Sequence, residues 1–522
     1  MLFQSYVFIL LFFPLCLAGF WMLSQRGKTA LAQLWLIGFS IWFYAWANPV
    51  SLAVLAGSIA VNYGLCRKLG NAGKKADTGA ETGKKIPADR RKLLLWAGIG
   101  FNAALLFYFK YFDFFVDNLN AVFRTDWTFS ALLWPLGISF FTFQQIAYLV
   151  DVYREEETCC SLREYALFVS CFAYVSSGPI VTAGEMLPGY RAIGKERFDA
   201  EKFTRGLYLF TLGLAKKVLL ADTFGKSVDF GYANVAALSG TDALLVMLFY
   251  TLQLYFDFSG YCDMGRGIAH MLGFELPVNF DSPYRSSNLV EFWRRWHITL
   301  NRFFLKYIYI PLGGSRRGSA RTYANLFLIF LISGIWHGAG WNFIVWGALH
   351  GAVYVLTKAW LKYREGHKKG AAENVQAGCG RILSRILSRT GHAAGVFGTF
   401  LFVNICWIFF RAANLAEAGA MLGRILKGGF GMPSAGVTAP FNLEEFWYVM
   451  KIFHLDRLAG SGMYLCAGIT LTALGLVFFH KNAGEMEKKF KPGTWNMILT
   501  AGLFLWCVLS LGSVSSFVYF QF

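Results

Sequence analysis

The chain of 522 residues is too hydrophobic for an ordinary soluble enzyme, because 56% of its residues are hydrophobic and only 15% are charged. With a mean hydropathy of +0.44, its composition favours a polytopic membrane protein. The net charge of +18 does not indicate a nucleic-acid-binding protein. The basic residues are concentrated in loops between apolar segments, and such basic loops are typical of the cytoplasmic side of a membrane protein.

Apolar windows predict membrane-spanning helices along the whole chain, because a helix needs ~20 residues to cross the hydrocarbon core. The first window has no basic residues before it, so we interpret it as a retained span and not as a cleaved signal peptide. Gly178 and Pro179 interrupt another window, which we expect to enter the membrane and return. Such a re-entrant segment is tolerated only where its backbone is buried in protein or lines a cavity. The thirteen windows are residues 3–23, 31–47, 49–65, 93–117, 132–150, 165–183, 206–222, 241–256, 324–337, 341–361, 395–411, 462–479 and 496–515.

Two strongly basic loops predict the orientation. Residues 66–92 and 362–394 are rich in Lys and Arg, so we place both loops in the cytoplasm. The twelve windows other than 165–183 then alternate, and both chain ends lie on the outer face. We predict a single membrane-embedded domain over residues 1–522, with amphipathic helices on the outer surface between residues 412 and 461.

The ten cysteines show no metal-ligand spacing, and the adjacent Cys159 and Cys160 are poorly placed to bridge each other. We therefore expect neither a metal site nor a disulfide framework.

Two histidines stand out between Asn288 and Gly351, because His297 and His337 each follow a Trp directly and lie between long apolar segments. An ionisable residue inside a membrane span is costly, so each is a functional candidate. For His297 the alternative is a buried histidine that is hydrogen-bonded within the fold.

The spacing of apolar residues predicts one continuous helix from Leu289 to Tyr307, with an aromatic face toward the interior and a basic face away from it. The interior face is expected to carry Trp293, His297, Leu300 and Phe304, and the basic face Arg294, Arg302 and Lys306.

His337 lies deeper in its window. If Arg321 marks the inner surface, His337 is about 16 residues or about 24 Å further along a helix, well inside a hydrocarbon core that is ~30 Å thick. Gly334, Gly338 and Gly340 surround it and leave room either for a substrate or for close packing of helices.

Several long motifs in this chain resemble one known family. They are EFWRRWHITLNRFF, YIYIPLGGSRRG, SGIWHGAGWNFIVWGALHG, LGISFFTFQQIAYLVDVYR, YFDFSGYCDMGRGIAHMLGFELPVNF and CWIFFRA. Together they resemble the membrane-bound O-acyltransferase family, in particular its bacterial branch of alginate and peptidoglycan O-acetyltransferases, from about Ala103 onward. The chain departs from the family pattern at FAYVSSGPIV, residues 172–181, which puts substrate detail in doubt.

The resemblance implies an all-α polytopic membrane fold with re-entrant segments and a central chamber. It implies that His337 is the catalytic residue and His297 its companion. It further implies a bacterial inner-membrane enzyme that transfers an acetyl group from cytosolic acetyl-CoA across the membrane, for O-acetylation of an extracytoplasmic polysaccharide by a separate partner transferase. Besides acetyl-CoA and this partner, membrane lipids are the expected ligands; no nucleic acid and no metal are expected.

Imidazole, with a pKa near ~6.5, suits the removal of a proton from an acceptor hydroxyl. Neither a Ser-His-Asp constellation nor a Gly-x-Ser-x-Gly motif is evident in the sequence. We therefore favour direct attack by the acceptor on the thioester over a serine acyl-enzyme.

The final residues, FVYFQF at 517–522, resemble an aromatic motif at the ends of bacterial members of the family, in which the Tyr carries the acyl group. The corresponding residue here is Tyr519. The alternative is a belt of aromatic residues at the outer interface.

Other ionisable residues carry weaker signals. Arg316 and Arg317 are candidates for contact with the phosphates of coenzyme A, although a basic anchor at the inner leaflet explains them equally well. His350 is interpreted as structural. A polar cluster within the family-like motif is expected to pair within the fold; it comprises Asp257, Asp263, Arg266 and His270.

A transporter or exporter is the alternative function, because broken helices and polar residues at mid-membrane depth also occur in transporters. The lack of an evident inverted repeat and the two Trp-His motifs favour the transferase.

Overall fold

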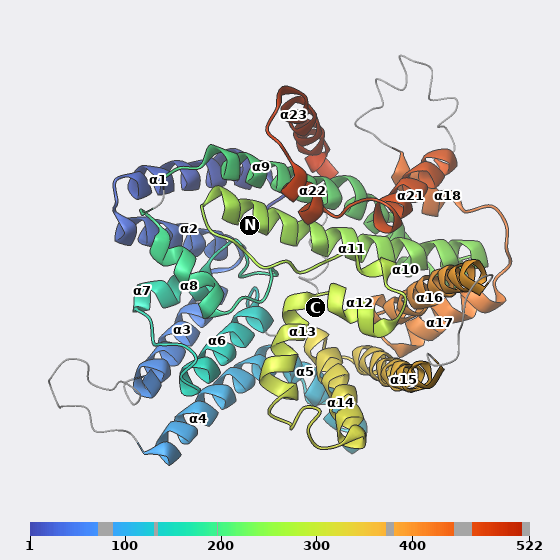
Figure 1. Ribbon diagram of the computed structural model, residues 1–522, viewed down its shortest axis with the longest axis horizontal. Helices are drawn as coiled ribbons and strands as arrows, with labels where there is room; N and C mark the ends of the chain where they lie inside the picture. The colour runs from blue at the N-terminus through green and yellow to red at the C-terminus, as the bar shows by residue number, and fades with distance from the viewer. Residues whose placement is uncertain (71–86, 130–133, 196, 372–379, 443–461, 514–522) are drawn as a thin grey trace. The chain divides into compact units, whose positions relative to one another are not determined.

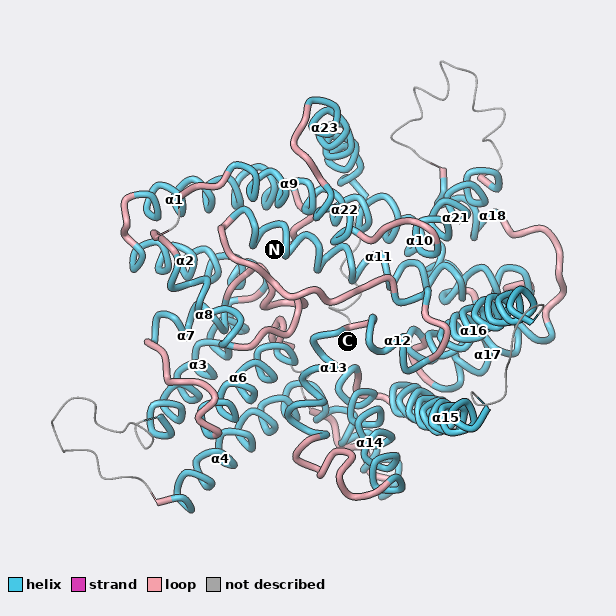
Figure 2. Tube along the Cα trace, in the orientation of Figure 1, coloured by secondary structure: helices cyan, strands magenta, loops and turns pink. Residues whose placement is uncertain are grey.

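The structure is a computed structural model, which describes residues 1–70, 87–129, 134–195, 197–371, 380–442 and 462–513. Every regular element within these ranges is helical, and Figure 2 shows helices and loops without a strand. The predicted all-α polytopic fold is therefore confirmed.

The described chain forms two compact units that are interleaved in the sequence. Unit 1 comprises residues 1–215, 260–277 and 487–522, and unit 2 comprises residues 216–259 and 278–486. The long helix α11 (Gly240–Met271) contributes its first part to unit 2 and its last part to unit 1. The expectation of a single domain stays a prediction.

The helices of unit 1 are α1 (Phe13–Gln25), α2 (Thr29–Ala47), α3 (Pro49–Gly70), α4 (Ala88–Leu106), α5 (Phe112–Phe123), α6 (Ile138–Tyr153), α7 (Leu162–Ser170), α8 (Ala183–Ala192), α9 (Ala200–Ala215) and α23 (Thr494–Leu509). Those of unit 2 are α10 (Asp222–Ala233), α12 (Leu289–Arg295), α13 (Ile298–Phe304), α14 (Ser319–His337), α15 (Trp341–Ala371), α16 (Gly380–Arg411), α17 (Leu415–Lys427), α18 (Ala435–Thr438) and α21 (Met463–Phe478). The short α22 (Ala483–Lys489) passes from unit 2 to unit 1. Figure 1 labels these helices along the chain.

Seven helices among the described residues are long and apolar enough to cross a membrane, and α21 with α22 forms an eighth candidate that is bent by 69°. This is fewer than the twelve full spans that the apolar windows predict. Window 206–222 falls on α9, which continues without a break through the π-helical turn η3 (Lys216–Ala221) into α10 and is not among the seven. Windows 132–150 and 496–515 instead overlap α6 and α23, which have 16 residues each. At 1.5 Å per residue such helices are about 24 Å long, which is short of the hydrocarbon core. The seven are Phe8–Gln25, Thr29–Trp46, Pro49–Gly70, Ala88–Phe123, Gly240–Met271, Trp341–Gly366 and Thr390–Arg411.

The window at 165–183 is broken, as predicted, but the break begins eight residues before Gly178. Helix α7 ends at Ser170, a series of turns follows, and residues 167–181 are all buried. A side chain at Gly178 would meet the Cα of Tyr174 at 2.4 Å, so only glycine permits this turn. The Tyr174 hydroxyl donates to the Phe168 carbonyl at 2.7 Å. The non-helical backbone is thus enclosed by protein, which is the condition for such a segment in a membrane.

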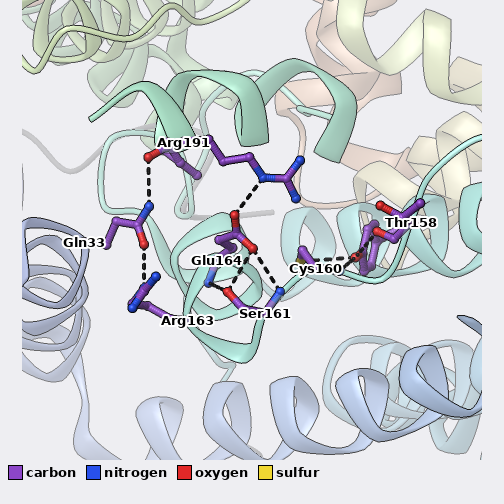
Figure 3. A network of polar contacts seen from close by, with 9 residues as sticks. Gln33, Thr158, Cys160, Ser161, Arg163, Glu164 and Arg191 are labelled. Carbon is purple, nitrogen blue, oxygen red and sulfur yellow. Dashed lines mark hydrogen bonds and ion pairs between the residues drawn. The ribbon is translucent and has the colours of Figure 1, made fainter. Parts of the chain in front are cut away.

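A network of polar contacts holds the start of α7, as Figure 3 shows. Ser161 and Glu164 form a capping box, in which each side chain accepts from the other residue's backbone N–H. The Arg191 guanidinium donates to Glu164 at 2.7 Å, and that of Arg163 donates to Gln33 at 2.6 Å. Burial raises the pKa of Glu164, but the hydrogen bonds from Arg191 and Ser161 outweigh it, so that the pKa is lowered overall. The charged form of Glu164 therefore stabilises this helix start.

Two thiols meet where α3 contacts the loop between α6 and α7. The Sγ atoms of Cys66 and Cys159 are 3.1 Å apart, and both residues are reduced. Gly70, one turn after Cys66, permits this approach, because a Cβ there would lie 2.9 Å from the Cβ of Cys159. The neighbouring Cys160 instead contacts the Tyr148 hydroxyl, with its Sγ at 3.2 Å.

This contact predicts the product of mild oxidation. An aromatic disulfide reagent should convert the two thiols of Cys66 and Cys159 to a disulfide, with release of two reagent thiols, because the sulfurs need to move by only about 1 Å. Peptide mapping by mass spectrometry would identify the bridge. The Cys160→Ser variant should still form it, and Cys159→Ser should not. A bridge from Cys66 to Cys160 in the unchanged chain would contradict the packing described above.

Candidate active site

His297 lies at a break between two helices, not within one. Helix α12 ends at Arg295 and α13 begins at Ile298, and between them His297 adopts a left-handed backbone with φ of 45°. The predicted continuous helix from Leu289 to Tyr307 is therefore wrong. Asn301 accounts for the break, because its amide donates to the Trp296 carbonyl at 2.8 Å and to the Trp293 carbonyl.

The predicted faces nevertheless agree with burial. Arg294 and Arg302 are exposed. Four residues are at least 96% buried, namely Trp293, His297, Leu300 and Phe304.

The amide oxygen of Asn279 fixes His297. This oxygen lies 3.2 Å from His297 Nδ1 and accepts from the backbone N–H of Thr299 at 3.2 Å and from its hydroxyl at 2.9 Å. Because an amide oxygen only accepts hydrogen bonds, the proton of a neutral His297 resides on Nδ1 and the lone pair on Nε2. Burial lowers the pKa of His297 below its ordinary value, so the neutral imidazole is the form present at neutral pH.

An aromatic ring on α11 supports the same imidazole. The ring of Phe258 meets it edge-on, with centroids 4.9 Å apart and planes at 88°. His297 is therefore held by a hydrogen bond on one side and by a rigid apolar contact on another.

His337 is the last residue of α14 and is 3% exposed. The rings of Trp346 on α15 and Phe410 on α16 both lie 5.1 Å from its imidazole. The ring of Trp336 contacts both histidines, at 4.9 Å from His337 and 6.2 Å from His297. The structure thus brings together the two histidines that the sequence singles out, around one indole.

The glycines near His337 serve close packing. A Cβ at Gly334 would meet the Phe343 carbonyl at 2.4 Å, and a Cβ at Gly338 would meet the Phe343 ring at 2.1 Å. Gly347 on α15 lies against the Phe330 carbonyl of α14 in the same way, at 2.5 Å. Of the two alternatives that the sequence leaves open for Gly334 and Gly338, the geometry favours close packing of helices.

His350 is enclosed in the same aromatic cluster. Its Nδ1 accepts from the Trp293 indole N–H at 3.3 Å, and its ring lies 4.7 Å from that of Trp346. This contact joins α12 to α15 and agrees with a structural interpretation.

Asn279 and Asn342 are site residues that the sequence does not single out, and Trp336 is notable in the sequence only as the residue before His337. The Asn342 amide on α15 donates to the carbonyls of Phe409 and Ala412, at 3.1 and 2.8 Å, and so ties α15 to the end of α16. All three lie inside motifs that carry the family resemblance, and a polar residue between apolar neighbours is the signal available for Asn279.

The remaining candidates differ in their placement. Arg316 and Arg317 are exposed in the turn before α14, whose other end carries His337, about 27 Å away at 1.5 Å per residue. Tyr519 lies outside the described residues.

The polar cluster expected around Asp257 is in fact two separate groups. Asp257 lies 2.7 Å from the buried ammonium of Lys217, which also donates to Asp222 at 2.7 Å. Lys217 follows Lys216 in a π-helical turn, η3 (Lys216–Ala221), and such turns are frequent at functional sites. Asp257 directly precedes Phe258, so this ion-pair group anchors the part of α11 that supports His297.

The second group lies in unit 1. Arg266 lies 3.1 Å from Glu487 and 3.8 Å from Asp263, and His270 Nδ1 lies 3.5 Å from Glu487. The expectation that these residues pair within the fold is confirmed, but their main partners, Lys217 and Glu487, were not predicted.

The sequence of this chain is similar to those of known membrane acyltransferases. The sequence model of the membrane-bound O-acyltransferase family matches residues 152–366, a range that includes both histidines. The chain is 35% identical over 555 residues to a peptidoglycan O-acetyltransferase of Helicobacter pylori, covering 100% of this chain and 98% of the relative. It is also 35% identical over 546 residues to the "Probable alginate O-acetylase AlgI" of Pseudomonas putida, covering all of both chains. A teichoic acid D-alanyltransferase of Lacticaseibacillus rhamnosus is 29% identical over 46% of this chain and 62% of its own length.

The ion-pair group predicts a large loss of stability on removal of its cation. Lys217→Met leaves Asp222 and Asp257 buried without their counter-charge, which should lower the free energy of unfolding by about 3–5 kcal/mol. Thermal unfolding of the purified protein in detergent would measure the change.

Lys216→Met is the matched control, because Lys216 is only half-buried and lies 3.4 Å from the Ser259 hydroxyl. We expect it to cost less than about 1 kcal/mol, and the double variant Lys217→Met/Asp257→Asn to recover part of the loss. Equal stability of the two single variants would show that the buried group is not an anchor.

Proposed function

Because the chain belongs to the membrane-bound O-acyltransferase family, we propose that it transfers an acetyl group from cytosolic acetyl-CoA across the bacterial inner membrane, for O-acetylation of an extracytoplasmic polysaccharide. Its membership makes it a multi-pass membrane O-acyltransferase. The names of two full-length relatives, a peptidoglycan O-acetyltransferase and a probable alginate O-acetylase, support acetyl as the group and an envelope glycan as its destination. The same membership favours a transferase over a transporter.

One observation carries the assignment of the chemistry to residues. His297 and His337 are both buried and both contact the indole of Trp336, within the range that matches the family. We assign His337 the role of general base and His297 that of a companion that orients the acceptor or the donor.

The reaction requires one proton transfer to the base and one from it. His337 removes the proton of the acceptor hydroxyl, and the oxygen forms a bond to the thioester carbonyl carbon. As the tetrahedral adduct collapses, the bond between carbon and sulfur breaks, and the proton passes from His337 to the coenzyme A thiolate. A neutral imidazole is needed at the start. The enclosure of the site excludes water, which otherwise competes with the acceptor.

Two further assignments complete the proposal. The exposed Arg316 and Arg317 are suited to bind the phosphates of coenzyme A at the cytoplasmic surface. Tyr519 is proposed as the first acceptor, from which a partner transferase outside the membrane takes the acetyl group. An aryl ester suits this onward transfer, because phenol, with a pKa near ~10, is a better leaving group than an alkyl alcohol.

Substitution of the two histidines tests the assigned centre. His337→Ala should reduce acetylation of the glycan by about 10²–10⁴-fold, because it removes the general base, while the protein still accumulates in the membrane. His297→Ala should reduce it less. Acetate released from the purified glycan by alkali would measure the effect.

His392→Ala is the control, because this histidine is exposed on α16, and it should retain full acetylation. Near-normal acetylation with both His337→Ala and His297→Ala would refute the assigned centre.

Tyr519→Phe tests the acceptor. The variant keeps the ring and loses only the hydroxyl, so an aromatic belt would survive and a covalent relay would not. We expect glycan acetylation to be lost, and we expect mass spectrometry to detect an acetyl group on the C-terminal peptide of the unchanged chain. Full acetylation in the variant, with no adduct in the unchanged chain, would leave Tyr519 as an interface residue.

A further inference from the structure

An open groove runs between α1 and α2, which lie side by side in unit 1 (Figure 1). Its volume is about 510 Å³, within the range of small-ligand sites. Both helices are long and apolar enough to cross a membrane. The groove is lined by Met22, Leu23, Leu31, Leu34, Trp35, Gly38, Phe39 and Trp42.

Two glycines shape the groove, because one is packed against a side chain and the other has open space beside it. Gly19 lies directly under Trp35, because a Cβ there would approach the indole to 2.3 Å. The Trp35 indole N–H also donates to the Cys16 carbonyl at 3.0 Å, so this wall of the groove is fixed. A Cβ at Gly38 would meet no atom within 4 Å. Gly38 therefore leaves a notch in the α2 face of the groove.

Several apolar side chains that line the groove are exposed to its surroundings. Met22, Leu31 and Leu34 are each about half exposed, at 51%, 47% and 51%. In a membrane-spanning pair of helices such a surface faces hydrocarbon, so its occupant must be apolar.

One end of the groove is cationic. Met22 and Leu23 lie about one helical turn before the turn of Arg26, Gly27 and Lys28, and Arg26 and Lys28 are both exposed. The first turn of α2 contains no acidic residue. The groove thus passes from an apolar trough to two positive charges over a few residues.

A neighbouring segment adds a third cation. The Thr29 hydroxyl donates to the Ile193 carbonyl at 2.7 Å, and the Gly194 N–H donates to the Ser24 hydroxyl at 3.1 Å. These bonds hold the end of α8 against the turn, and the next residue, Lys195, is exposed.

We propose that this groove binds an anionic phospholipid, with one acyl chain lying in the trough and the headgroup phosphate paired with Arg26 and Lys28. An apolar trough that ends in exposed basic residues matches both parts of such a lipid. A membrane-spanning helix of another protein fits less well. The volume of a helix about 10 Å wide and about 30 Å long is several times that of the groove, and such a helix need not carry a negative charge at the end that meets Arg26 and Lys28. The proposal does not depend on the proposed catalytic function.

Filling the notch tests the trough. The full-length protein would be purified in detergent and then mixed with phosphatidylglycerol or phosphatidylethanolamine of the same acyl chains, and bound lipid would be counted by native mass spectrometry. Gly38→Leu places a side chain in the groove, so we expect the fraction of protein carrying phosphatidylglycerol to fall about tenfold, as several methylene contacts are lost.

Gly57→Leu is the matched control for the notch. Gly57 lies within α3, is exposed, and also has no atom within 4 Å of a Cβ. This variant should bind lipid like the unchanged chain. Equal lipid binding by Gly38→Leu and Gly57→Leu would overturn the proposal.

Removal of the charges tests the headgroup. The double variant Arg26→Gln/Lys28→Gln should lose its preference for phosphatidylglycerol over phosphatidylethanolamine. The control, Arg67→Gln/Lys68→Gln, removes two exposed basic residues at the end of α3 and should keep the preference. An unchanged preference in the first variant would overturn the headgroup assignment. A single-span protein that co-purifies from native membranes and is displaced by Gly38→Leu would overturn the lipid as occupant.

Discussion

The geometry around His297 depends on one amide oxygen, that of Asn279. A left-handed backbone at a residue other than glycine costs about 1–3 kcal/mol, and a break in a buried helix leaves carbonyls without their helical partners and away from water. The side chains of Asn279 and Asn301 offset both costs. The amide oxygen of Asn279 lies within hydrogen-bond distance of His297 Nδ1 and accepts from the N–H and the hydroxyl of Thr299. The amide of Asn301 donates to the carbonyls of Trp293 and Trp296. Hydrogen bonds contribute about 1 kcal/mol each, so the set suffices to hold the strained histidine.

The second histidine is fixed by packing. His337 ends α14, and the close approach of α14 to α15 at Gly334 and Gly347 decides where that end lies. The indoles of Trp336 and Trp346 then contact its imidazole. Such rings bury a large area with few rotatable bonds. They therefore make the site more rigid than a lining of flexible aliphatic side chains would. Rigidity of this kind suits a reaction in which positioning supplies much of the rate.

The sequence was sufficient for the helical membrane fold, for the presence of a break in the window at 165–183 and for the buried face that carries His297, because hydrophobic periodicity and the backbone preferences of glycine and proline act locally. It did not place the start of that break, because α7 already ends at Ser170. It was insufficient for the left-handed backbone at His297, because Asn279, which holds that histidine, lies 18 residues earlier. The break itself is stabilised by the nearby Asn301, but one Asn within an apolar pattern does not by itself predict a break. The partners of Asp257 and Arg266 could not be predicted either, because Lys217 and Glu487 are distant in the chain and only the fold brings them close. Apolar windows also overestimated the full spans, because a window reports hydrophobicity but not where a helix ends, as at α6 and α23.

The charges near the candidate site follow one electrostatic rule. Asp257 and Phe258 are neighbours on α11, so one residue pairs with Lys217 while the next supports the imidazole of His297. Lys217 is shared between Asp222 and Asp257, so both buried carboxylates have a counter-charge, and the turn of α11 that carries Phe258 is held in place. The neutral state of His297 has a different cause, because burial alone lowers the pKa of its imidazole. A neutral imidazole that keeps its proton on Nδ1, facing Asn279, is the form that the proposed companion role requires, because its orientation is then fixed by the fold and does not depend on a charge.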